Sequence, residues 1–188
     1  MVDAATLSQQ FSRAQDWPTY LASDAARAEP WRSIYAATSL TAPQAALLGS
    51  FRRRMHVLCL SGIWCGDCSA QGPMLQRIAE ASPLIQLRFA DRDLHASLAE
   101  QVRICGGLRV PTVIFMAEDF AFCALLGDRT ISRYRAIATR QLGESCPLPG
   151  APADADSAAA TLQEWVNEFE RVHLMLCLSA RLRERHGD

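Results

Sequence analysis

The strongest sequence clue to the fold lies between residues 55 and 82. Residues 55–61 are almost continuously apolar, have the length of a strand and are followed by Gly62. Residues 63–68 then read Ile-Trp-Cys-Gly-Asp-Cys, and residues 65–82 have a helical pattern that contains Pro73. A strand without polar alternation is expected where both faces of a sheet are covered. The segment therefore predicts an α/β fold in which two cysteines lie at a strand-to-helix turn.

This placement gives the two cysteines different chemistry. Cys65 lies at the predicted helix N-terminus, where free amide groups and the positive end of the helix dipole favour an anion. Its pKa should therefore fall below the free-thiol value of roughly 8.5. Cys68 lies one helical turn deeper, within reach of Cys65, so the pair can close a small disulfide ring. We expect the Cys65 thiolate to attack a substrate disulfide and Cys68 to resolve the mixed disulfide.

Two other interpretations of the Cys-x-x-Cys pair stay open. The pair could supply half of a structural zinc site, which would need a second pair or histidines at suitable spacing. It could instead be two buried structural thiols, although Trp64 and Gly66 fit an exposed turn better than a core. The remaining candidate ligands show no paired spacing; they are Cys105, Cys123, Cys146, Cys177, His56, His95, His173 and His186.

The rest of the chain predicts helices around three further strands. Residues 1–51 favour short helices that restart at prolines, with Thr41 as a cap. A capping-box pattern of Thr161 and Glu164 predicts the start of a last helix. Between them we expect a strand at 84–90, a helix at 94–104, strands at 110–116 and 121–126, and a helix at 130–142.

These patterns divide the chain into four parts. Residues 1–51 are predicted to form a helical N-terminal extension, and residues 52–142 the α/β core. Residues 143–160 are rich in Pro, Gly, Ala and Asp, which is typical of a linker. Residues 161–188 are predicted to form a C-terminal helix that packs on the core. The two extensions either cover the sheet or form a docking surface for a partner.

The composition excludes several classes of function. All 19 Lys+Arg positions are Arg. The lack of Lys excludes Schiff-base chemistry, pyridoxal-phosphate anchoring and a Walker-type phosphate loop, because each of them needs a lysine. The net charge of −1 offers no excess positive charge for binding nucleic acid. No apolar run reaches the roughly 18 residues that a membrane span needs. Seven cysteines, an odd number, and the lack of a signal-peptide pattern favour a reducing, cytoplasmic compartment.

Three spaced elements resemble the thioredoxin family. The family signature Trp-Cys-Gly-Pro-Cys corresponds here to residues 64–68, and its helix-kinking proline to Pro73, five residues after the second cysteine. Its cis-proline loop corresponds to residues 110–112, Val-Pro-Thr, and a later family glycine to Gly127. The resemblance implies a thioredoxin-like fold: a central mixed sheet of about four strands flanked by helices, here with extra helices at both termini.

The resemblance also implies a function and a set of site residues. It implies a thiol–disulfide oxidoreductase that reduces protein disulfides, is re-reduced by an upstream reductant, and needs neither metal nor organic cofactor. Cys65 would be the attacking thiol and Cys68 the resolving thiol. Trp64 would shield the site, and a cis Pro111 would present the backbone of Val110 to the substrate. Gly66 and Asp67 complete the implied substrate-binding surface.

The sequence departs from the family between the cysteines. Asp67 stands where thioredoxin has proline, and its negative charge should raise the pKa of Cys65 relative to a neutral residue. A less stable thiolate disfavours the reduced form. We therefore expect a reducing pair, and a potential near the −120 mV or so of strongly oxidising pairs would contradict this.

A second departure concerns the buried acid that thioredoxins carry six residues before the first cysteine. This chain has Cys59 there, so proton transfer at the deeper thiol falls to Asp67, Asp91, Asp93 or water. Cys59 is expected to be a core thiol or, alternatively, a third redox thiol, as is Cys105. The loss of the acid also leaves open a redox-inactive interaction module whose helical extensions hold a partner protein.

Overall fold

The fold is built on a four-stranded mixed sheet. The structure is a computed structural model that describes residues 2–142 and 158–188. The strand order is β2-β1-β3-β4, with β1 parallel to β2 and antiparallel to β3, and β4 antiparallel to β3. This confirms the predicted α/β, thioredoxin-like architecture. The strands are β1 (Met55–Ser61), β2 (Ile85–Asp91), β3 (Thr112–Ala117) and β4 (Phe122–Gly127).

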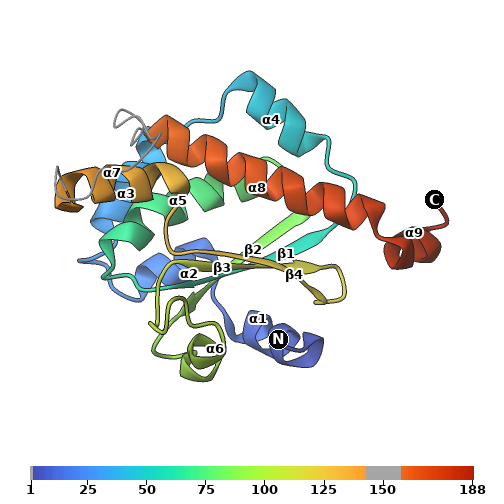
Figure 1. The fold of residues 1–188 in the computed structure, drawn as a ribbon, viewed down its shortest axis with the longest axis horizontal. Coiled ribbons are helices and arrows are strands. Elements are labelled where there is room, and N and C mark those ends of the chain that lie inside the picture. The colour runs from blue at the N-terminus through green and yellow to red at the C-terminus, as the bar shows by residue number, and fades with distance from the viewer. Residues whose placement is uncertain (1, 143–157) are drawn as a thin grey trace.

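Helices lie on both sides of this sheet (Figure 1). Helices α3, α5, α7 and α8 gather on one side, and α1 and α6 lie on the other. The long helix α8 contacts α5 and α7 on its side of the sheet. The described helices are α1 (Ala4–Arg13), α2 (Trp17–Ala22), α3 (Glu29–Ala37), α4 (Ala42–Gly49), α5 (Gly66–Glu80), α6 (Ala96–Gln101), α7 (Ile131–Leu142), α8 (Ala158–Leu178) and α9 (Ala180–His186).

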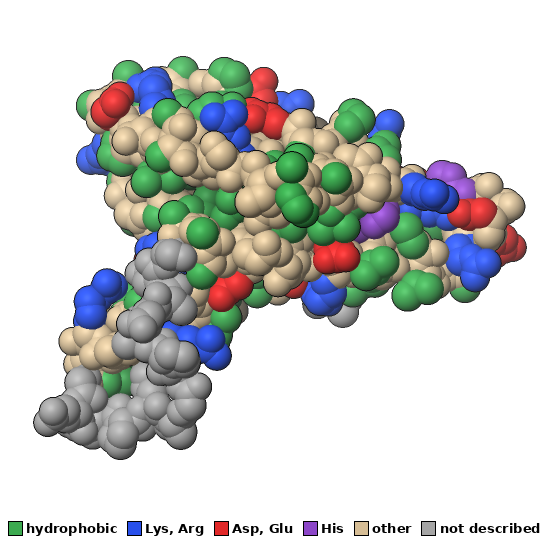
Figure 2. Space-filling model, turned by 90° about the horizontal axis from the view of Figure 1, so that it is seen from above, with side chains coloured by type: hydrophobic (Ala, Val, Ile, Leu, Met, Phe, Trp, Pro, Cys, Tyr) green, Lys and Arg blue, Asp and Glu red, His purple; other side chains and the backbone are tan. Residues whose placement is uncertain are grey.

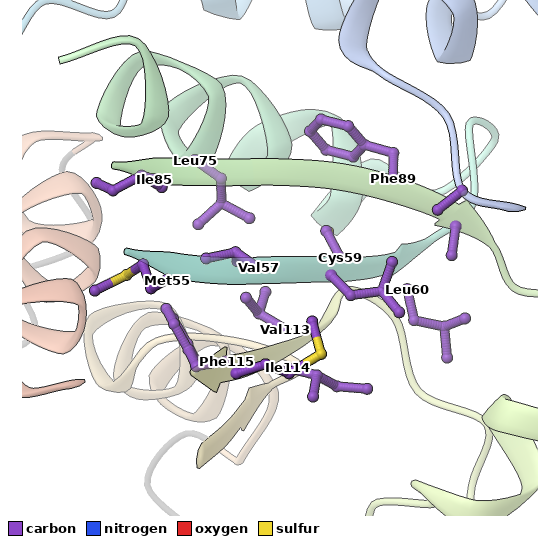
Figure 3. Packing of buried hydrophobic residues seen from close by; sticks show 14 of the residues in the cluster. Met55, Val57, Cys59, Leu60, Leu75, Ile85, Phe89, Val113, Ile114 and Phe115 are labelled. Atoms are coloured by element: carbon purple, nitrogen blue, oxygen red, sulfur yellow. The ribbon is translucent and has the colours of Figure 1, made fainter. Parts of the chain in front are cut away.

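The first strand forms the centre of the core. All seven residues of β1 are buried, as expected for a strand covered on both faces. Cys59 pairs in register with Phe89 of β2 and Val113 of β3 and lies among them in the hydrophobic cluster of Figure 3. Burial of this apolar surface is the main favourable contribution to folding.

The N-terminal helices form where their start signals predict them. Helices α2, α3 and α4 each carry proline in the first turn, where its missing N–H costs no hydrogen bond. Thr41 and Gln44 form a complete capping box at the start of α4. After α1, Gln15 exchanges two backbone hydrogen bonds with Phe89 and so covers the outer edge of β2.

Two predicted element starts are wrong by two residues each. Helix α6 begins at Ala96 rather than 94, because the Asp91 side chain accepts the backbone N–H groups of Asp93 and Leu94 in a turn. Strand β3 begins at Thr112 rather than 110, since Pro111 has no N–H for the sheet. Most of the predicted linker, residues 143–157, lies outside the described residues.

The predicted capping box of the last helix is also wrong. Helix α8 begins at Ala158, so Thr161 and Glu164 lie inside it. The Glu164 carboxylate instead accepts the backbone N–H of Ser132 at 3.1 Å, in the first turn of α7. An acidic side chain at a helix N-terminus satisfies free N–H groups there. Glu164 therefore joins α8 to α7 rather than starting its own helix.

The second half of α8 is only partly covered by the core. Val172 and Leu176 are buried against the core, whereas the side chains of Leu174, Met175 and Leu178 are exposed. On the face seen in Figure 2, basic, acidic and apolar side chains are intermingled rather than gathered by type. Of the helices that the structure describes, none is both long and apolar enough to cross a membrane.

Candidate active site

The loop between β1 and α5 brings Cys65 to the surface. Cys65 is the N-cap residue of α5 and has extended backbone angles, φ −88° and ψ 125°. The buried indole of Trp31 donates from Nε1 to the Ile63 carbonyl at 3.0 Å and so fixes the loop from below. A Cβ on Gly62 would meet the Trp64 ring at 2.7 Å, so this glycine lets the indole lie against the backbone. The sequence thus places a half-exposed sulfur at a helix N-terminus, as predicted.

The Cys65 sulfur is held in a setting that favours its thiolate. The Cys68 thiol donates a hydrogen bond to it and is the largest influence that lowers the pKa of Cys65. Partial burial opposes ionisation, while the backbone N–H groups of Cys68 and Asp67 favour it. The negative charge of Asp67 raises the pKa, in the direction expected from the sequence. The balance lowers the pKa of Cys65 to about 6.

The Cys68 thiol is in the opposite situation. It is fully buried in the first turn of α5, and burial raises its pKa well above that of a free thiol. Its hydrogen bond to the Cys65 sulfur raises it further, because the proton is used in that bond. At neutral pH one sulfur is therefore a thiolate and the other holds a proton, as an attacking and a resolving thiol require.

A buried cluster lies behind Cys68 where thioredoxins carry an acid. Burial raises the pKa of Cys59, so this thiol stays protonated, in agreement with a core residue. The hydroxyl of Ser61 lies near Cys59 and Cys68 and favours their ionisation. Tyr20 of α2 is buried beside the same groups, and burial raises its pKa. Sequence reasoning missed Ser61 and Tyr20, because only the fold brings α2 to this end of β1.

The loop before β3 faces Cys65. The Val110–Pro111 peptide bond is cis, which confirms the cis Pro111 that the family resemblance implied. The Cys65 Sγ lies 3.7 Å from the Val110 carbonyl oxygen, so residues 45 apart meet at the site. Gly127 closes this loop from β4: a Cβ there would lie 2.6 Å from the Pro111 oxygen. The glycine match is thus explained by a close backbone approach.

Trp64 and Gly66 border the sulfur on its open side. The Trp64 side chain is 44% exposed, and the Arg92 guanidinium lies 4.8 Å from its ring centroid. Gly66 is exposed and has open space around it. Trp64 and Gly66 are thus exposed on either side of Cys65 in the chain, whereas Val110 and Pro111 of the facing loop are buried.

Asp67 has partners that the sequence did not indicate. Its carboxylate pairs with Arg129, just before α7, at 2.6 Å and with Arg133 of α7 at 2.7 Å. Burial raises the pKa of Asp67, but the hydrogen bonds from Arg133 and Arg129 outweigh burial and bring it below its ordinary value. Arg129 precedes α7 and Arg133 lies in its first turn, so both arginines stand at the N-terminal end of that helix.

The other cysteines that the structure describes lie in different settings. Cys105 is exposed, Cys123 is partly buried, and the Cys177 sulfur lies 3.4 Å from His173 Nε2. Cys146 lies outside the described residues. Across residues 2–142 and 158–188, no three His, Cys, Asp or Glu side chains are placed to hold a metal ion.

Comparisons with known proteins agree with this geometry. A family model described as thioredoxin matches residues 14–137. The chain belongs to the thioredoxin family. The thioredoxin match begins inside the predicted N-terminal extension, so family similarity includes some of the helices that pack beside the sheet. A search of curated proteins finds no significant match.

Two solved structures share the fold of this thioredoxin-family chain. One is a protein of unknown function, PA1234, from Pseudomonas aeruginosa, with 18% identity and a TM-score of 0.66 over 92% of this chain and 97% of that one. The other is an HIV epitope scaffold with 16% identity and a TM-score of 0.64 over 88% and 95% of the two chains. At this identity the likeness shows the fold alone.

Proposed function

We propose that this protein is a thiol–disulfide oxidoreductase that reduces protein disulfides through a reversible Cys65–Cys68 disulfide. One observation carries the proposal. The half-exposed Cys65 is the N-cap residue of α5, and Cys68 is fully buried in the first turn of the same helix. This setting lowers the pKa of Cys65 to about 6, while Cys68 keeps its proton. This difference separates an attacking sulfur from a resolving one at neutral pH.

In the first step the Cys65 thiolate attacks one sulfur of the substrate disulfide. A Cys65–substrate disulfide forms and the substrate S–S bond breaks. The electron pair leaves on the second substrate sulfur, which takes a proton from solvent. The cis Pro111 loop would align the substrate, since the Val110 backbone lies beside the Cys65 sulfur.

In the second step Cys68 loses its proton and attacks the Cys65 sulfur. The Cys65–Cys68 disulfide forms, the bond from Cys65 to the substrate breaks, and the first substrate sulfur leaves and is protonated. The substrate gains two electrons from the two cysteine sulfurs. Of the two protons that it takes up, the first comes from solvent, because Cys65 starts as a thiolate, and the second is balanced by the proton that Cys68 loses. An upstream two-electron dithiol reductant would restore the pair, and the cytoplasm is the compartment we propose for this cycle.

Reduction of insulin disulfides by dithiothreitol, followed as turbidity, tests the proposal. Wild type should accelerate the reaction, and the Cys65→Ser variant should not. Cys105→Ser removes an exposed thiol outside the pair and should behave as wild type. Equal rates for wild type and Cys65→Ser would favour the redox-inactive interaction module instead, and zinc in the purified protein would favour a metal site.

A further inference from the structure

The carboxylate between the two cysteines is held by two arginines from a distant element. Arg129 Nη2 contacts Asp67 Oδ2 and Arg133 Nη2 contacts Oδ1, so each arginine takes its own oxygen. The three side chains are only 16%, 22% and 21% exposed for Asp67, Arg129 and Arg133. Ion pairs shielded from water in this way interact more strongly than exposed ones.

A network that reaches α8 fixes this arrangement. Gln71 Nε2 donates to the Asp128 carbonyl at 3.0 Å and to the Asp67 carbonyl at 3.3 Å. Gln71 Oε1 accepts from Trp165 Nε1 at 3.2 Å. The Arg129 guanidinium is also held by the Asp128 carboxylate at 3.2 Å. The segment that carries the arginines is therefore anchored to α5 and α8.

We propose that Arg129 and Arg133 are positioning residues of the dithiol site: by pairing with Asp67, they shield Cys65 from a negative charge that would disfavour its thiolate. Where thioredoxin has proline between its cysteines, this chain has a negative charge that pairs with two positive ones. The importance of the thiolate rests on the proposed function, but its ionisation is measurable without any substrate.

The charges around Cys65 support this role. The titratable groups that act on it are Cys68 and Asp67 of α5 and Cys59 of β1. Cys59 is held protonated by burial, and Cys68 keeps its proton, so Asp67 is the one ionised neighbour among them. Its charge raises the pKa of Cys65, and its two arginines are placed to reduce that effect.

The test is the pH dependence of Cys65 alkylation by iodoacetamide in the full-length reduced protein, with the site identified by mass spectrometry. In the Arg129→Gln/Arg133→Gln variant the midpoint pH of Cys65 alkylation should rise by about half a pH unit or more. At a pH well below the midpoint, that shift is about a threefold loss of the thiolate fraction. Arg129→Lys/Arg133→Lys keeps both charges and should stay closer to wild type. Arg171→Gln breaks an ion pair elsewhere on α8 and should change nothing.

The same double substitution in an Asp67→Asn background separates the proposed role from others. With no carboxylate to shield, removal of the arginines should shift the Cys65 midpoint much less. An equal shift in both backgrounds would overturn the proposal, because the arginines would then act on the sulfur directly. No shift with Asp67 present would also overturn it. Either result leaves the insulin assay free to decide the proposed function.

Discussion

The two cysteines of one short motif differ because of where their sulfur atoms lie. Cys65 is half-exposed at the start of α5, and its neighbours lower its pKa to about 6. Cys68, three residues later, is buried and its pKa is raised. Cys59 is fully buried, and burial raises its pKa as well, so this thiol also keeps its proton.

Native alkylation should reflect this difference. In a Cys105→Ser background, which removes another exposed thiol, iodoacetamide should modify Cys65 with an apparent midpoint near pH 6. The reagent reacts with the thiolate, and the pKa of Cys65 is lowered to about 6. Cys59 and Cys68 should react only after denaturation. Mass spectrometry of quenched samples gives the rate at each site. A midpoint near the free-thiol value of roughly 8.5 would contradict the described setting of Cys65.

Two glycines let neighbouring elements pack closely enough to position the loops of the site. The end of β4 lies against the loop of the cis Pro111, and only a residue without Cβ fits at Gly127. Gly72 of α5 has the same role against α3, since a Cβ there would lie 2.2 Å from the Trp31 ring. These contacts set the position of the loops on either side of Cys65.

Gly127→Ala should therefore weaken both folding and activity. The added Cβ must displace the Pro111 loop, which should cost about 1–3 kcal/mol in the free energy of unfolding. Urea unfolding and the insulin assay together measure the effect. Gly49→Ala at the end of α4 is the matched control, because the added Cβ would meet only the Ala81 carbonyl oxygen, at an ordinary contact distance of 3.9 Å. Equal stability of Gly127→Ala and wild type would show that the loop yields without cost.

Short sequence motifs predicted the parts of the site that lie within one motif, but not the contacts between distant residues. The apolar strand, the N-cap position of Cys65 and the Pro111 loop follow from short motifs. The Asp67–Arg133 pair joins residues 66 apart, and Ser132 and Glu164 are 32 apart. Such contacts depend on how helices pack, which no motif encodes. For the same reason, Thr161 and Glu164 match a capping box in the sequence but lie inside α8 and do not cap its start.

Across the molecule, the terminal segments are joined to the sheet by polar as well as apolar contacts. Buried Trp31 holds the active-site loop, and the Gln10 side chain of α1 lies 2.6 Å from His95 before α6. His173 of α8 accepts the backbone N–H of Arg52 at 2.9 Å through Nε2. The helices around the sheet therefore support the site rather than stand apart from it.

These buried histidines make stability depend on pH. Burial lowers the pKa of both His95 and His173, so the folded protein binds fewer protons there than the unfolded chain does. The stabilisation of the folded state by these neutral histidines is fully present above the unfolded pKa of about 6.5. It is lost as the pH falls from that value through the lower pKa values of the folded protein. Urea midpoints should thus be lower at pH 5.5 than at pH 7.5. His173→Gln should reduce this difference, and an unchanged difference would show that His173 does not cause it.

Redox titration of the wild-type protein in dithiothreitol buffers, with peptide mapping of the disulfide, decides whether the pair works as a reversible couple. The account predicts one two-electron transition that forms only the Cys65–Cys68 disulfide, at a potential well below the −120 mV or so of strongly oxidising pairs. Cysteines that stay reduced throughout, or a disulfide formed with another thiol, would contradict it.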